Sequence, residues 1–72
     1  MTFGQRVREW RRRRFLTQQG LADLLGVSYM TVQRWELGQG MPRMNHQKRL
    51  MEVLELTPTE LFAALDEGKA AA

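Results

Sequence analysis

The fold is decided by one stretch, TQQGLADLLGVSYMTVQRWELG, which runs from Thr17 to Gly38. Thr17 is a suitable N-cap for a first short helix, and Gly26 can end that helix because it tolerates positive φ. Ser28 can cap a second helix only two residues later. Ala22 supplies the small side chain that two crossing helices need where their backbones approach. The stretch therefore predicts two short helices that meet across a tight turn.

The second helix of this pair, from about Ser28 to Leu37, is expected to have two different faces. Val32 and Trp35 are apolar and are spaced to face the rest of the domain. The opposite positions recur at intervals of three and four residues, as neighbours on one helix surface do. These positions are Met30, Gln33, Arg34 and Leu37. The inner side chains are expected to anchor the helix and to leave its outer face free.

Three further helices are predicted around this pair, and no strand is, so the chain is expected to be all-α with five short helices. The first is expected to begin at Thr2, whose hydroxyl can form a capping box with the Gln5 amide. The fourth is expected from about Met44 to Leu54. The fifth is expected to follow a second capping box, made by Thr57 and Glu60.

Apolar residues at helical spacing define the expected core. They are Phe3, Val7, Trp10, Leu21, Ala22, Leu24, Leu25, Val32, Trp35, Met44, Leu50, Met51, Leu54, Leu61, Phe62 and Leu65. Two positions depart from the preferred residue type. Gly20 lies inside a helix and is expected to soften it. Glu55 stands where a glycine often ends a helix, and a positive φ there would cost about 1 kcal/mol or more.

Length and composition allow a single domain, which is expected to cover residues 1–67 and to leave 68–72 as a frayed tail. The chain has no cysteine, so neither a disulfide nor a thiolate metal site can support this small core. No run approaches the ~20 apolar residues of a membrane span. The N-terminus lacks the apolar segment of a signal peptide. A cytoplasmic location is therefore expected.

Charge is divided unevenly between the two parts of the chain. Residues 1–49 carry ten Lys and Arg against three Asp and Glu, whereas residues 50–72 carry one Lys against five acids. This polarity favours a basic face that meets a polyanion, although a merely solvated surface would look the same. His46 stands alone, and there is neither a glycine-rich phosphate loop nor a cluster of metal ligands. We therefore predict no enzyme activity, no cofactor, no metal and no small-molecule ligand.

The sequence closely resembles the Cro/repressor-type (XRE) helix-turn-helix family. The resemblance covers about residues 3–65 and rests on Arg11, TQQGLADLLGVS, TVQRWELG, Pro42 and LMEVLELTPTELF. It implies a compact five-helix, lambda-repressor-like domain. It also implies that the third helix, at about residues 29–37, enters the major groove of double-stranded DNA.

The resemblance implies which side chains of the third helix read bases. These are Tyr29, Met30, Thr31, Gln33 and Arg34. Their chemistry fits, because Arg34 can form two hydrogen bonds to a guanine and Gln33 can do the same to an adenine. Tyr29 could instead pack at the start of the helix, and Met30 could instead be a partly buried filler.

The resemblance also implies phosphate contacts and one structural ion pair. Gln18, at the start of the second helix, is expected to hold a phosphate together with the backbone N–H groups there. Ser28, Gln39 and Arg43 are the other phosphate contacts that the resemblance implies, although these three and Gln18 could instead be ordinary caps or surface residues. The arginines left over from the run are candidates for a phosphate or for solvent, and at least one of Arg12, Arg13 and Arg14 is expected on a phosphate, with Arg12 and Arg13 preferred. Arg11 is expected to pair with Glu36 and to hold the fold together rather than read DNA.

We therefore predict a sequence-specific transcription regulator, a repressor, that binds a palindromic operator as a homodimer. Leu61, Phe62 and Leu65, with the tail, are the candidate dimer interface, unless these three belong to the core of their own domain. Two other functions stay open. The basic, aromatic segment 2–16 could lie on a membrane surface. Leu37 could instead serve a protein-binding adaptor or an antitoxin.

Overall fold

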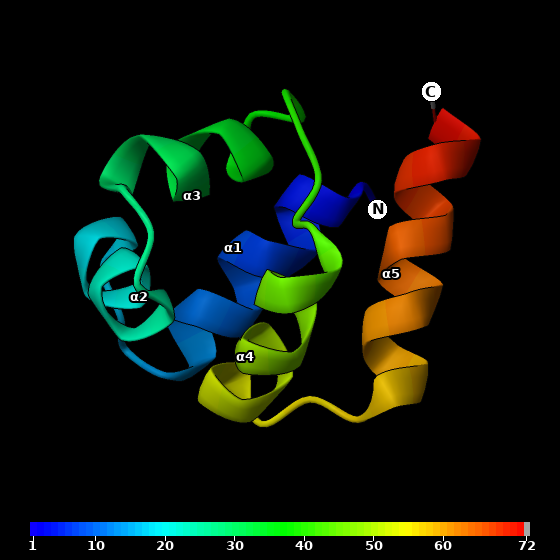
Figure 1. The fold of residues 1–72 in the computed structure, drawn as a ribbon. Helices are drawn as coiled ribbons and strands as arrows, with labels where there is room; N and C mark the ends of the chain where they lie inside the picture. Colours follow the sequence, from blue (N-terminus) through cyan, green and yellow to red (C-terminus); the bar gives the residue numbers. More distant parts are fainter. Residues whose placement is uncertain (72) are drawn as a thin grey trace.

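The computed structural model describes the backbone of residues 1–71 and the side chains of residues 1–67. The regular secondary structure of the described part is helical throughout, as predicted, and the helices follow one another along the chain as α1 to α5 (Figure 1). The bounds are Phe3–Arg13 for α1, Gln18–Leu25 for α2, Tyr29–Glu36 for α3, Met44–Leu54 for α4 and Pro58–Ala71 for α5. No helix in the described part is both long enough and apolar enough to cross a membrane.

The predicted helix starts are confirmed at the level of single hydrogen bonds. Thr2 and Gln5 form both bonds of a capping box, and the Thr17 hydroxyl accepts from the backbone N–H of Gly20. Thr57 and Glu60 exchange the same pair of bonds at the start of α5. These caps satisfy backbone N–H groups that a helix terminus otherwise leaves unpaired. They explain why the sequence located the helix starts well.

All five helices bury apolar side chains in one shared cluster. Its members are Phe3, Val7, Trp10, Leu21, Ala22, Leu25, Val32, Trp35, Leu50, Leu54, Leu61, Ala64 and Leu65. Phe3 and Trp10 pack edge to face, with ring centroids 6.4 Å apart. The sequence prediction is wrong for Leu24, Met44 and Phe62, which are 46%, 83% and 53% exposed. Each lies on an amphipathic helix just outside the stripe that faces the cluster.

α1 and α3 approach so closely at Gly4 that no side chain fits between them. A Cβ on Gly4 would lie 2.4 Å from the Trp35 carbonyl oxygen and 2.6 Å from that of Glu36. Real Cβ atoms essentially never come this close to backbone atoms. Gly4 therefore sets how near α3 lies to α1.

Two residues other than glycine hold a left-handed backbone, each just after a helix. Phe15 follows α1 with φ of 56°, and Glu55 follows α4 with φ of 54°. The positive φ considered for Glu55 from the sequence is thus present. The Phe15 ring is 95% exposed, so no burial compensates its backbone conformation. The Glu55 carboxylate forms an ion pair with Arg14.

The last helix extends past the expected end of the domain. The helical backbone of α5 continues through Gly68 to Ala71, beyond the domain boundary placed at residue 67. Residue 72 and the side chains of 68–71 lie outside the described residues. Fraying of this segment stays a prediction.

Candidate nucleic-acid interface

The two faces of α3 differ sharply in exposure. Val32 is fully buried and Trp35 is 4% exposed, so the inner face is fixed in the core. On the outer face, Tyr29 is 40% and Met30 55% exposed, and the Arg34 side chain is exposed as well. Gln33 is half-buried. The helix itself spans Tyr29–Glu36, slightly shorter than the predicted 28–37 or 29–37, because Ser28 and Leu37 are its caps.

Ser28 and Thr31 are joined at the start of α3. The Ser28 hydroxyl accepts from the backbone N–H of Thr31 at 3.3 Å, and the two hydroxyl oxygens lie 3.0 Å apart. Each hydroxyl therefore has a local partner before any ligand arrives. Ser28 was predicted as a phosphate contact and Thr31 as a base contact, and both assignments stay predictions.

Three helices meet at the Glu36 carboxylate. Arg11 of α1 donates through Nε to Glu36 Oε2 at 2.7 Å and through Nη2 to Oε1 at 3.0 Å. Gln18 of α2 donates to the same Oε1 at 3.2 Å. Arg11 also donates to the Leu16 carbonyl at 2.9 Å. The side chains of Arg11 and Glu36 are only 13% and 5% exposed, so this junction is nearly closed to solvent.

The Arg11 guanidinium is held in its charged form at this junction. The hydrogen bonds to Glu36 raise the pKa of Arg11 above its ordinary value, against the opposing effect of partial burial. Arg11 is therefore a cation that Glu36 largely neutralises. Gln18 uses one amide N–H here, and its predicted phosphate contact stays a prediction.

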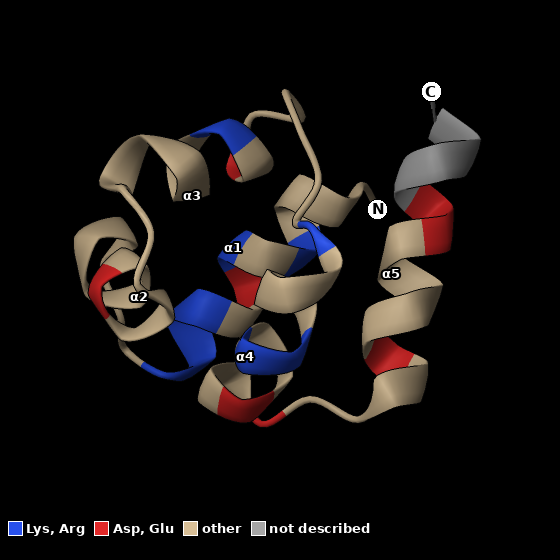
Figure 2. Ribbon diagram, in the orientation of Figure 1, with Lys and Arg blue, Asp and Glu red and all other residues tan. Residues whose placement is uncertain are grey.

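The arginines of α1 fall into two groups. Three have carboxylate partners, namely Arg6 with Glu67, Arg11 with Glu36 and Arg13 with Glu9. Among the described side chains, no carboxylate lies within ion-pair distance of Arg8 or Arg12. Figure 2 shows the basic residues of α1 and the acidic residues of α5 on separate helices. The sequence prediction gave Arg12 and Arg13 equal standing, and the structure distinguishes them.

Gln39 and Arg43 lie in the segment between α3 and α4, and both are exposed. Arg43 occupies the N-cap position of α4 but makes no side-chain cap hydrogen bond. Its guanidinium is therefore not committed to the helix start. This placement is compatible with the predicted phosphate contacts of both residues.

Sequence reasoning missed two residues of this region, Gly4 and Arg8. The spacing of Arg8 and Arg12, four residues apart on a predicted helix, could have indicated that they share a face. Nothing in the sequence indicated the backbone contact at Gly4, because it depends on how α3 crosses α1. Within residues 1–67, no group of three or more His, Asp or Glu side chains is arranged to hold a metal ion.

Comparison with known proteins places this geometry in a family. The helix-turn-helix domain family matches residues 2–65. The HTH-type transcriptional regulator DicA of Escherichia coli is 36% identical over 96% of this chain and 50% of its own length. The HTH-type transcriptional activator BcrR of Enterococcus faecalis is 33% identical over 88% of this chain and 31% of its own length. No solved structure matches.

The chain thus has the architecture of a helix-turn-helix domain, and it belongs to the helix-turn-helix domain family. The predicted resemblance to Cro/repressor-type (XRE) regulators is confirmed by these relatives. The family is one of transcription regulators rather than enzymes. The chain spans about half or less of the length of the curated relatives it matches.

Proposed function

We propose that this protein regulates transcription by binding double-stranded DNA sequence-specifically, with α3 in the major groove. One observation carries the proposal, which is that α3 is fixed on one face and free on the other. Val32 and Trp35 are buried, while Met30 and Arg34 are exposed on the opposite side. A helix held this firmly can present side chains to base edges in a defined register.

The outer face of α3 carries the chemistry that base recognition needs. Arg34 can form two hydrogen bonds to guanine O6 and N7, and Gln33 can bond an adenine in the same way. Met30 and Thr31 can pack against a thymine methyl group. Tyr29, at 40% exposed, completes the proposed reading set. Gln18, Ser28, Gln39, Arg43 and Arg12 are the proposed phosphate contacts. Arg13, which the sequence also offered, is engaged with Glu9 and is left out of the proposed set.

The proposed active form is a homodimer on a palindromic operator, because one module of this size offers few base contacts. Leu61 is fully buried and Leu65 is 8% exposed, so these two belong to the core of their own domain. Of the predicted interface, Phe62 and the tail remain, and the tail side chains lie outside the described residues. Phe62 lines an open groove that also contains Met41 and Met44, both of them exposed. We propose this apolar groove as the contact with the second copy.

Repression is the form of regulation that occupancy of DNA produces by itself, since a bound protein excludes others from the same duplex. We therefore propose that the protein is a repressor. A cytoplasmic location is a separate proposal, carried over from the sequence. One relative is named an activator, so a reporter gene placed behind the selected operator decides the sign. Sedimentation with and without the operator decides the stoichiometry, and one bound subunit per duplex would contradict the dimer.

The reading helix is tested by selecting bound duplexes from a random pool and then comparing Arg34→Ala with the parent protein. Arg34→Ala is expected to cost about 1–3 kcal/mol in binding and to relax the preference at one base pair. It is expected to leave the melting temperature unchanged, because the side chain is exposed. Arg13→Ala removes the same charge and serves as the control. Equal weakening of every sequence by both variants would contradict the assignment of α3.

A further inference from the structure

Arg8 and Arg12 form an unusual pair on the surface of α1. They lie four residues apart, so their side chains are neighbours on one face of the helix. Both are exposed, and no described carboxylate is within ion-pair distance of either. Like charges at this spacing destabilise a helix. A protein that neutralises Arg6, Arg11 and Arg13 on the same helix leaves this pair uncompensated.

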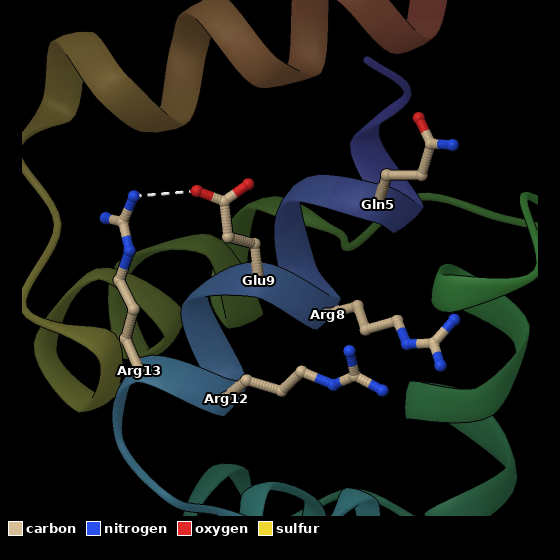
Figure 3. A pocket seen from close by; sticks show the side chains of 5 residues that line it. All are labelled: Gln5, Arg8, Glu9, Arg12 and Arg13. Atoms are coloured by element: carbon tan, nitrogen blue, oxygen red, sulfur yellow. Dashed lines mark hydrogen bonds and ion pairs between the residues drawn. The ribbon is translucent and has the colours of Figure 1, made fainter.

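The one acidic residue between them in sequence is turned away. Glu9 accepts from Arg13 at 2.7 Å. Figure 3 shows the Arg8 and Arg12 side chains extending in the same direction, while the Glu9 carboxylate and the Arg13 guanidinium point toward each other. These four residues and Gln5 line a shallow, open depression of the surface. Arg8 and Arg12 supply the cations there that have no described ion-pair partner.

The pair also lies beside the junction that holds α3. Arg11, next to Arg12 in sequence, clasps Glu36 at the end of α3. Gly4, one turn before Arg8, touches the backbone of the same end of α3. Gln18, the first residue of α2, donates to the same carboxylate. Arg8 lies four residues after Gly4 and three before Arg11, so it is a neighbour of both on the surface of α1 and stands at the edge of the α3 junction.

We propose that Arg8 and Arg12 together bind a backbone phosphate of the duplex, next to the phosphate held at the start of α2. The inference rests on the proposed DNA-binding function and extends it to a part of the surface outside the helix-turn-helix pair. Two guanidinium groups offer planar forks of donors that match the oxygens of a phosphate. The contact adds affinity and orients the domain without reading sequence.

The test compares the salt dependence of binding for Arg8→Ala, Arg12→Ala, the double variant and Arg13→Ala on the selected operator. Each phosphate contact contributes about 0.9 to the slope of log K against log salt. Because the two arginines share one phosphate, the double variant is expected to lower the magnitude of the slope by about 1. Arg13→Ala removes the same charge from the same helix and is expected to leave the slope close to that of the parent. Lysine at both positions is expected to restore most of it.

Base preference and melting temperature distinguish a failure of this phosphate contact from a failure of the proposed DNA-binding function. The base preference of the double variant, selected from a random pool, is expected to match that of the parent. Its melting temperature is expected not to fall, because neither side chain has a described partner to lose. Equal slopes for the double variant and Arg13→Ala would overturn the proposal while leaving the reading helix intact. A changed base preference would overturn it as well, and failure of the parent to bind any duplex would overturn both.

Discussion

α1 has two junctions, one with α3 and one with α5, and they are built differently. At the α3 junction the backbones touch at Gly4, and Arg11 and Glu36 pair with almost no exposure to solvent. At the α5 junction the polar contact is the pair of Arg6 and Glu67, whose side chains are both 37% exposed. Apolar side chains of both helices lie in the shared core. The first junction fixes the position of α3 relative to α1, and the second mainly buries apolar surface between α1 and α5.

This difference fits the proposed roles of the two partner helices. A helix that reads bases, as proposed for α3, has to keep its distance and rotation relative to the phosphate contacts, because base contacts tolerate little displacement. Backbone contact and a two-pronged ion pair define such a position tightly. α5 needs only to cover the core, and an exposed ion pair adds little to that. The predictions below test whether the two junctions differ as described.

Glu36→Ala is expected to have the largest effect. It leaves the Arg11 guanidinium nearly buried without its carboxylate and removes the acceptor of Gln18, which we expect to cost about 3 kcal/mol of stability. Urea unfolding measures the loss, and base preference among the molecules that still fold should not change. Glu36→Gln keeps an acceptor for Arg11 and should lose less. An unchanged melting temperature for Glu36→Ala would contradict the structural role of the pair.

Gly4→Ala tests the backbone contact itself. In a free helix, alanine is more favourable than glycine by about 0.5–1 kcal/mol. Here the new Cβ would meet two carbonyl oxygens, so we expect a loss of about 1–3 kcal/mol instead. The sign of the change in thermal stability is therefore diagnostic. Gly20→Ala is the control, because its nearest contacts are side-chain atoms, at 3.2 Å or more. A stabilised Gly4→Ala protein would contradict the close approach.

Phe15→Gly should raise the free energy of unfolding. It could then be combined with Glu36→Ala or Gly4→Ala, so that these destabilised variants stay folded and their losses can be measured. The left-handed conformation costs a residue other than glycine about 1–2 kcal/mol, and glycine's extra freedom in the unfolded chain recovers part of that. We expect a net gain of about 0.5–1 kcal/mol, since the exposed ring contributes no burial. Phe15→Ala removes the ring but keeps the strain, so it should change little. A gain of equal size in both variants would show that the ring, not the backbone, is responsible.

Glu67→Gln should have the smallest effect and a distinctive pH dependence. The hydrogen bond from Arg6 lowers the pKa of Glu67 below its ordinary value. A carboxyl with a lowered folded pKa contributes stability above its unfolded pKa and loses that contribution as pH falls through the folded value. The melting temperatures of the parent and Glu67→Gln should therefore differ slightly at pH 7 and converge below about pH 4.5. A difference in melting temperature that persists unchanged to lower pH would contradict the pairing of Glu67 with Arg6.

The sequence predicted the helices well because their signals are local. Thr2, Thr17, Ser28 and Thr57 each cap a helix through contacts within a few residues, and such contacts can be inferred without knowing the fold. Burial was harder at the margins of each apolar stripe. Met44 begins α4 at 83% exposed, because the side chain at a helix end faces the core only if the neighbouring helix reaches that far.

The candidate site was predicted less completely than the fold. The outer face of α3 followed from spacing, since Val32 and Trp35 define the inner face. Apart from Arg11, which the family resemblance assigned to Glu36, the arginines of α1 could not be distinguished from the sequence, because the partner of each depends on tertiary placement. Arg6 forms an ion pair with Glu67 and Arg14 forms one with Glu55, and both partners are far away in the sequence. Only after these pairs are known do Arg8 and Arg12 stand out as uncompensated.

The contact at Gly4 has a consequence for altering what the protein recognises. The spacing between α1 and α3 there is determined by main-chain atoms and not by the volume of any side chain. Met30, Gln33 and Arg34 can therefore be exchanged for other residues without disturbing the depth at which α3 is presented. The domain is a scaffold on which recognition can be rewritten independently of folding, and Gly4 is the position that such redesign has to leave untouched.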